Sequence, residues 1–202
     1  MTLRLLLLAA AYFIGGIPFG FLLVRLKTGR DVRTLGSGNI GATNVVRTTG
    51  RALGVLTLLL DIAKGSCAVW LMDRFGGGDV LWTSAAAAVV MLGHAFPAVL
   101  KFQGGKAVAS FVGAYLYLAP VPLLACLILF VAVVAYSRYI SLGSILAAAL
   151  FPFAVWLILH PAWPVVASAL FSGAFIVWRH RSNIQRLRAG NENVFSFGGK
   201  KK

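Results

Sequence analysis

The 202-residue sequence contains very little acid. Five Asp and Glu residues stand against 19 Lys and Arg, Glu192 is the only glutamate, and the formal net charge is +14. In a soluble protein this positive excess would suggest a nucleic-acid partner. Here the basic residues occur in short runs between apolar segments, so we expect no nucleic acid. The pattern indicates topology signals and contacts with anionic small substrates or membrane lipid headgroups.

The sequence is also poor in cysteine. Cys67 and Cys126 are the only two, and both lie within apolar runs. They form neither a C-x-x-C pair nor a metal-ligand spacing, so we interpret them as buried small hydrophobic residues.

The sequence is rich in long apolar runs and poor in charged residues. The chain is 59% hydrophobic and 12% charged, with a mean hydropathy of +0.87, whereas soluble domains average about 45–50% apolar and about 25% charged residues. The first run, residues 3–24, is long enough to span a bilayer and predicts an uncleaved first helix. The sequence therefore predicts an all-α polytopic membrane protein in which residues 1–202 form a single domain.

Seven apolar segments are expected to cross the bilayer. The stretch 107–137 is too long for one ordinary span, and Pro120 and Pro122 divide it into two short segments that meet in a turn at 119–122. The other five segments cover about 3–24, 52–72, 80–100, 141–159 and 165–178. A five-span alternative treats 107–137 as one crossing and merges the later segments.

The basic residues also predict the orientation. Of the 19 Lys and Arg residues, only Arg4, Lys64 and Arg74 lie outside the odd-numbered loops and the C-terminal tail. Because cytoplasmic loops are enriched in Lys and Arg, we expect the N-terminus outside and the C-terminus in the cytoplasm. Residues 193–202 are expected to form a flexible basic tail.

The first basic loop has the composition of an anion site. Leu35–Arg47 reads L-G-S-G-N-I-G-A-T-N-V-V-R. It matches G-x-G-x-x-G without a surrounding βαβ unit, and it resembles a Walker A loop except that Ala42 occupies the lysine position. Its glycines still let backbone N–H groups converge on an anion, and Arg47 could grip a phosphate with two hydrogen bonds. Neutral side chains that could assist are Ser37, Asn39, Thr43 and Asn44. An ordinary polar turn is the alternative.

Two further segments carry weaker signals. Gly104, Gly105 and Lys106 offer bare backbone and a cation, although a lysine beside a span is commonly a topology signal. Ser141 and Ser144 are three residues apart at a helix start, where N-capping is the competing explanation.

The C-terminal segment and the second span contain isolated polar pairs. His180 and Asn183 share a side if that segment is helical, which lipid contact does not explain, and Glu192 is expected to pair with an arginine. Asp61 and Lys64 lie within a span, where each charge costs roughly 2.5–3.5 kcal/mol, so we expect them to be paired or to face a polar interior. Structural stabilisation and substrate contact are both open for that pair.

Taken in order, these segments resemble the bacterial acyl-phosphate-dependent glycerol-3-phosphate acyltransferases. The resemblance rests on G-S-G-N-I-G-A-T-N-V-V-R at 36–47, D-I-A-K-G at 61–65, G-H-A-F-P at 93–97, G-G-K at 104–106, S-L-G-S-I at 141–145 and H-R-S-N-I-Q-R-L at 180–187. It implies transfer of an acyl chain from acyl phosphate to glycerol 3-phosphate at the cytoplasmic face of the bacterial inner membrane. The products would be lysophosphatidic acid and inorganic phosphate, in the first acylation of phospholipid synthesis. It also implies a monomer that needs no metal and no cofactor.

The resemblance assigns roles residue by residue. Catalytic residues would be Ser37, Arg47, His180 and Asn183. Substrate-binding residues would be Gly38, Asn39, Thr43, Asn44, Gly104, Gly105, Lys106, Ser141 and Ser144. Asp61, Lys64 and Glu192 would be structural. The second motif departs from the family's usual K-G-G-K-G-V-A-T, because this chain has Gln103, Ala107 and Ser110.

The implied chemistry agrees with the composition. The glycerol acyltransferases that use thioesters rely on an H-x4-D pair, and none of the three histidines is followed by an Asp at that spacing. An acyl phosphate has a good leaving group, so direct attack needs mainly positioning and neutralisation of two phosphates. The base would be His180 or the phosphate of glycerol 3-phosphate itself. The rival from another class is an anion or phosphate-ester transporter, which would favour paired broken helices at the bilayer midplane.

Overall fold

The structure, a computed structural model, describes residues 1–195, and in that range every regular element is a helix. The predicted all-α class is therefore confirmed. Residues 196–202, most of the predicted basic tail, lie outside the described range. The chain divides into two compact units between Leu118 and Ala119. This boundary coincides with the break predicted at Pro120. The prediction of a single domain stays a prediction.

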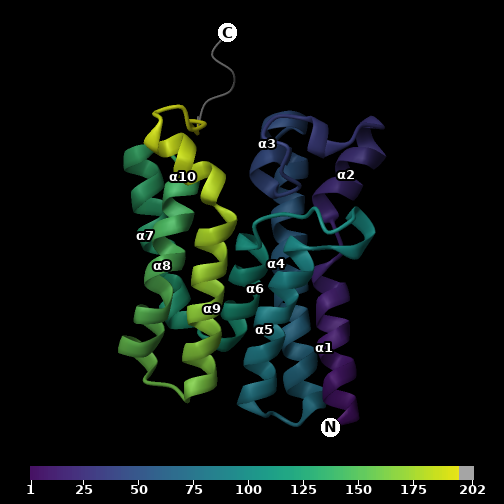
Figure 1. The fold of residues 1–202 in the computed structure, drawn as a ribbon, viewed down its shortest axis with the longest axis vertical. Coiled ribbons are helices and arrows are strands. Elements are labelled where there is room, and N and C mark those ends of the chain that lie inside the picture. The colour runs from purple at the N-terminus through teal and green to yellow at the C-terminus, as the bar shows by residue number, and fades with distance from the viewer. Residues whose placement is uncertain (196–202) are drawn as a thin grey trace. The chain divides into compact units, whose positions relative to one another are not determined.

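The first unit contains eight helical elements. They are α1 (Thr2–Gly15), α2 (Phe19–Thr28), the 3-10 turn η1 (Val32–Thr34), α3 (Ala42–Thr49), α4 (Arg51–Gly76), α5 (Val80–Ala95), the 3-10 turn η2 (Ala98–Leu100) and α6 (Val108–Leu118). Helices α1, α4 and α5 run side by side, and α2 and α3 lie at the end of the unit away from the N-terminus (Figure 1).

The second unit is a bundle of three apolar helices followed by a short polar one. They are α7 (Pro120–Ser137), α8 (Ile140–Leu159), α9 (Trp163–Arg179) and α10 (Arg181–Arg188). Helix α8 packs against both α7 and α9 (Figure 1). After α10 the chain returns to the α7–α8 loop, where the Phe195 amide donates to the Arg138 carbonyl at 2.7 Å.

Five helical stretches are long and apolar enough to cross a membrane. They are Thr2–Thr28, Arg51–Gly76, Val80–Leu100, Pro120–Ser137 and Ile140–Leu159. Helix α9 has 17 residues and α6 only 11. An 11-residue helix is ~16 Å long, against a hydrocarbon core ~30 Å thick. The multi-pass architecture is thus clear, whereas seven crossings and the orientation of the termini remain predictions.

Close helix crossings in the first unit depend on glycine. A Cβ at Gly15 would overlap the Val90 carbonyl across the α1–α5 crossing, and one at Gly93 would overlap the Tyr12 carbonyl. Small residues let helix backbones approach closely where lipid provides no hydrophobic driving force. These crossings fix the C-terminal end of α5, from which one candidate site loop departs.

A small apolar core supports the other candidate site loop. Val24 of α2, Val32 of η1, Ile40 and Val45 are buried together with Leu100 of η2. The chain between α2 and α3 is therefore anchored on both sides of the glycine-rich segment.

Candidate active site

Asn44 organises the glycine-rich loop. Its side chain is 2% exposed and sits at the first turn of α3. Its Nδ2 donates to the carbonyls of Leu35 at 3.0 Å and Asn39 at 2.8 Å, and its Oδ1 accepts from the Ser37 amide at 2.9 Å. One amide therefore satisfies backbone groups on both sides of the turn, which gives the loop a fixed shape.

The loop presents its other polar residues outward. Ser37, Gly38, Thr43 and Arg47 are exposed. Gly36 and Gly38 have φ of +56° and +72°, in the left-handed region that favours glycine. Thr43 and Arg47 are one turn apart on α3, directly after the loop. Asn39 Oδ1 accepts from the Gly41 amide at 2.7 Å, so Asn39, like Asn44, shapes the turn itself.

The second loop is pinned to the end of α5. The Gly104 amide donates to the Ala95 carbonyl and the Gly105 amide to the His94 carbonyl, both at 3.1 Å. Gly105 is buried and Lys106 half-buried. Backbone strain gathers here, because Lys101 (φ 53°), Phe102 (φ 61°) and Ala107 (φ 62°) all adopt left-handed conformations.

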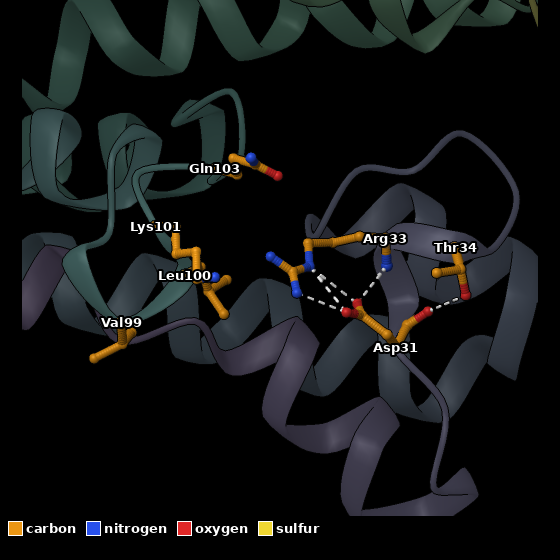
Figure 2. A pocket seen from close by; sticks show the side chains of 7 residues that line it. All are labelled: Asp31, Arg33, Thr34, Val99, Leu100, Lys101 and Gln103. Atoms are coloured by element: carbon orange, nitrogen blue, oxygen red, sulfur yellow. Dashed lines mark hydrogen bonds and ion pairs between the residues drawn. The ribbon is translucent and has the colours of Figure 1, made fainter.

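A cavity of about 410 Å³ lies between the segments that precede the two loops, within the first unit. One wall comes from Asp31, Arg33 and Thr34, shortly before Ser37 (Figure 2). The other comes from 99–101 and Gln103, directly before Gly104 (Figure 2). The segments that lead into the first and second motifs therefore face each other across one space.

The cavity wall contains a partly exposed ion pair. Arg33 donates through Nη2 to Asp31 Oδ2 at 2.7 Å and through Nε to both carboxylate oxygens at 3.1 Å (Figure 2). The hydrogen bonds from the Arg33 side chain lower the pKa of Asp31 below its usual 3.8.

Asp31→Asn is expected to destabilise the folded chain slightly at neutral pH. The pKa of Asp31 is lowered on folding, so its contribution is present above the unfolded pKa and is lost as pH falls through the folded value. We expect a deficit below about 1 kcal/mol at pH 7, since the pair is partly exposed. Thermal unfolding in detergent at pH 7 and at lower pH should show the deficit shrinking on acidification. A deficit that does not change with pH would contradict this assignment.

Ala107→Gly is expected to stabilise the protein. Ala107 is buried with φ of 62°, where a Cβ costs about 1–2 kcal/mol and glycine's extra entropy loss about 0.5–1 kcal/mol. The melting temperature should therefore rise by a few degrees. Ala114→Gly is the matched control, because Ala114 is equally buried but lies inside α6. Glycine is unfavourable in a helix interior, so this substitution should lower the melting temperature. Equal effects of the two substitutions would show that backbone strain at Ala107 is not the cause.

Asp61 and Lys64 form a buried ion pair, as their spacing predicts. Lys64 Nζ lies 2.7 Å from Asp61 Oδ1, and both side chains are 3% exposed. Lys64 Nζ also donates to the Ile17 carbonyl at 2.8 Å, in the break between α1 and α2. His94 Nδ1 lies 3.7 Å from the same Asp61 oxygen. The sequence did not predict this third member, since a lone histidine thirty residues away gives no local signal.

The second unit collects the C-terminal polar residues. Asn183 Nδ2 donates to Glu192 Oε1 at 3.0 Å, and Arg186 Nε donates to Glu192 Oε2 at 2.9 Å. The predicted pairing of Glu192 with an arginine is thus confirmed. His180, 3% exposed, has Nδ1 2.8 Å from the Ile176 carbonyl. Because a carbonyl can only accept, Nδ1 carries the proton, and Nε2 is the basic nitrogen of the neutral ring.

Neither serine near the start of α8 is an N-cap, so that alternative is wrong. The N-cap is Tyr139, and no side chain caps this end. Ser144 Oγ donates within the helix to the Ile140 carbonyl at 2.9 Å. Ser141 Oγ is buried without a hydrogen-bond partner among residues 1–195.

All five carboxylates are engaged with partners other than Arg47 and Lys106. Asp31, Asp61, Asp79 and Glu192 pair with Arg33, Lys64, Arg4 and Arg186, and Asp73 accepts from the Tyr117 hydroxyl at 2.8 Å. Among residues 1–195, Arg47 makes no ion pair, and no group of three His, Cys, Asp or Glu side chains could hold a metal ion. The cation beside the glycine-rich loop is therefore available to an external anion.

The structure groups the predicted residues within each unit. It brings the segments that precede the Ser37 loop and the Gly104–Lys106 loop to the two sides of one cavity, and it joins Asn183 to Glu192. Asp31, Arg33 and Lys101 line that cavity but were not predicted as site residues. Their charges were visible in the sequence, but their convergence depends on tertiary packing.

Comparisons with known proteins agree on one class. A family model described as glycerol-3-phosphate acyltransferase matches residues 5–190. Proteins named glycerol-3-phosphate acyltransferase from Geotalea daltonii and Geobacter sulfurreducens are 44% and 45% identical over 195 residues, with 96% of this chain and 99% of theirs covered. The crystal structure of PlsY (YgiH), an integral membrane glycerol 3-phosphate acyltransferase, in its glycerol 3-phosphate form has a TM-score of 0.90 and 36% identity, with 96% of each chain covered. Its lysophosphatidic acid form has a TM-score of 0.87 and 34% identity, with 96% of this chain and 95% of that chain covered.

The multi-pass helical fold and these matches over nearly the whole chain thus define an integral membrane acyltransferase. The chain belongs to the glycerol-3-phosphate acyltransferase family.

Proposed function

We propose that this chain transfers an acyl group from an acyl phosphate to the 1-hydroxyl of glycerol 3-phosphate. The products are lysophosphatidic acid and inorganic phosphate, in the first acylation of phospholipid synthesis. The observation that carries the proposal is the state of the charges around the first loop. Each of the five carboxylates has a partner other than Arg47, while Arg47 and the ordered Ser37 loop are open to an external anion. Two phosphorylated substrates need this arrangement.

The proposed reaction is direct transfer. The hydroxyl oxygen of glycerol 3-phosphate attacks the acyl carbonyl carbon, the bond from that carbon to the bridging phosphate oxygen breaks, and phosphate leaves with the electron pair. Arg47, Lys106 and the glycine backbone hold the phosphates, and Ser37 orients the reacting groups. Gly38 and Thr43 add contacts from the exposed face of the loop.

The hydroxyl proton passes to a base, for which His180 is the favoured candidate. Its Nδ1 donates to the Ile176 carbonyl, so Nε2 can accept the proton. The phosphate of glycerol 3-phosphate is the alternative base. Asn183, held by Glu192, and the two serines of α8 are proposed to contact substrate beside it.

Asn39 and Asn44 are proposed to act indirectly. The side-chain oxygens of both residues and the side-chain NH2 of Asn44 are bonded to the loop backbone, so they fix the positions of Ser37 and the following glycines. Contact of the Asn44 side chain with substrate would have to replace one of these hydrogen bonds.

The location follows from the same charge pattern. We propose a monomer in the bacterial inner membrane, with seven crossings and with the basic loops and the C-terminus in the cytoplasm, where lipid headgroups surround the site. Water-soluble glycerol 3-phosphate reaches this face directly, and the acyl chain reaches it from the bilayer.

A donor comparison tests the proposed function. The purified chain in lipid nanodiscs receives labelled glycerol 3-phosphate with acyl phosphate, acyl-CoA or acyl carrier protein thioester in separate reactions. We expect labelled lysophosphatidic acid with acyl phosphate and at most trace product with either thioester. Product from a thioester but none from acyl phosphate would overturn the proposed donor.

A further inference from the structure

His94 lies directly beneath the second loop. It is 3% exposed at the last turn of α5, and its carbonyl accepts from the Gly105 amide at 3.1 Å. Its ring is closer still, because a Cβ added at Gly105 would overlap Nε2. A Cβ added at Gly104 would instead overlap the backbone carbonyl of His94 and the Pro97 ring. The imidazole therefore forms the floor on which the Gly105 backbone rests, one residue before Lys106.

The ring is held from its other side by the buried charges of α4. Asp61 Oδ1 lies 3.7 Å from His94 Nδ1 and 2.7 Å from Lys64 Nζ. Lys64 Nζ in turn donates a hydrogen bond to the Ile17 carbonyl. Buried charges are costly inside a membrane protein and usually serve a function when they are kept. Here the chain of contacts runs from the break in the first helix to the loop that carries Lys106.

We propose that His94 is a positioning residue, which sets the height of the Gly104–Gly105 backbone and so places Lys106 against the phosphate of glycerol 3-phosphate. This inference rests on the proposed function. It assigns no proton transfer to His94. The ring acts by shape and by its fixed orientation on Asp61, so its removal should weaken binding of glycerol 3-phosphate more than it slows the chemical step.

A double-mutant cycle between His94 and Gly105 tests the proposal. His94→Ala should raise KM for glycerol 3-phosphate by ~10-fold while kcat changes less than about threefold, since a displaced loop mispositions one phosphate contact. Gly105→Ala should raise KM similarly, because the new methyl group pushes against the ring. In the double variant the methyl group occupies the space of the ring, so the two effects should be clearly less than additive.

Gly104→Ala is the matched control. Its added Cβ meets backbone and Pro97 rather than the imidazole, so its effect should add to that of His94→Ala. If His94→Ala fails to fold, His94→Asn replaces it in the cycle, because its shorter side chain withdraws from Gly105 and keeps a polar group towards Asp61. Additive effects of the His94 and Gly105 substitutions, or a loss confined to kcat, would overturn the proposal.

A binding readout separates this inference from the proposed function. The dissociation constant of glycerol 3-phosphate alone is measured for each variant by thermal-shift titration in detergent, without any acyl donor. Wild type that binds glycerol 3-phosphate but does not use acyl phosphate would contradict the proposed donor. In that case the coupling between the His94 and Gly105 substitutions, measured in Kd, would still test the positioning role of His94. Wild type that neither binds nor acylates glycerol 3-phosphate would overturn both.

Discussion

Replacing Arg47 with alanine should lower kcat/KM for glycerol 3-phosphate acylation by about 100-fold, the scale of a lost charge-assisted phosphate contact. Arg47 is exposed beside the Ser37 loop and makes no ion pair among residues 1–195, so its charge is available to substrate. The measurement is the initial rate of lysophosphatidic acid formation at several concentrations of each substrate.

Two variants control for charge alone. Arg30→Ala removes an exposed cation of the same basic loop outside the glycine-rich segment and should stay near wild type. Arg47→Lys keeps the charge without the planar fork and should recover only part of the activity. Equal losses in Arg30→Ala and Arg47→Ala would mean that the net charge of the face, rather than a specific phosphate contact, governs the rate.

Replacing His180 with alanine should slow the chemical step by about 100- to 10,000-fold in single turnover, the usual contribution of a positioned general base. His180 Nδ1–H donates a hydrogen bond to the Ile176 carbonyl, so Nε2 is the basic nitrogen of the neutral ring. Rapid-quench measurement with enzyme in excess isolates this step from product release.

A second histidine supplies the matched control for His180. His160 is exposed at the end of α8 with φ of 46°, a conformation that asparagine tolerates, so His160→Asn should leave the rate unchanged. A loss of only a few-fold in His180→Ala would assign the base to the phosphate of glycerol 3-phosphate, and His180 would then have a structural function.

The helix breaks and the buried pair could be predicted because their causes are local. Pro120 and Pro122 interrupt an apolar run, and the structure divides there at Ala119. Asp61 and Lys64 are one helical turn apart, so their pairing follows from helix geometry alone. Glu192 lies in a segment rich in arginine, so an ion pair was expected, and it forms with Arg186.

The remaining features depend on contacts between distant segments. The spacing of His94 from Asp61 along the chain gives no sign that their helices are packed together. The composition of the loop suggested that Asn44 binds substrate. In the structure its side-chain amide is hydrogen-bonded to the loop backbone, because the loop folds back over α3. The left-handed conformation of Ala107 was hidden as well, since alanine does not signal a positive φ as glycine does.

The most direct test of direct acyl transfer between two phosphorylated substrates is the stoichiometry of phosphate release. Purified chain in nanodiscs is mixed with acyl phosphate, first without and then with glycerol 3-phosphate, and both inorganic phosphate and lysophosphatidic acid are followed on the time scale of one turnover. We expect no burst of phosphate without glycerol 3-phosphate, and equal amounts of phosphate and lysophosphatidic acid once it is added. A burst equal to the enzyme concentration before glycerol 3-phosphate is added would reveal an acyl-enzyme and contradict direct transfer.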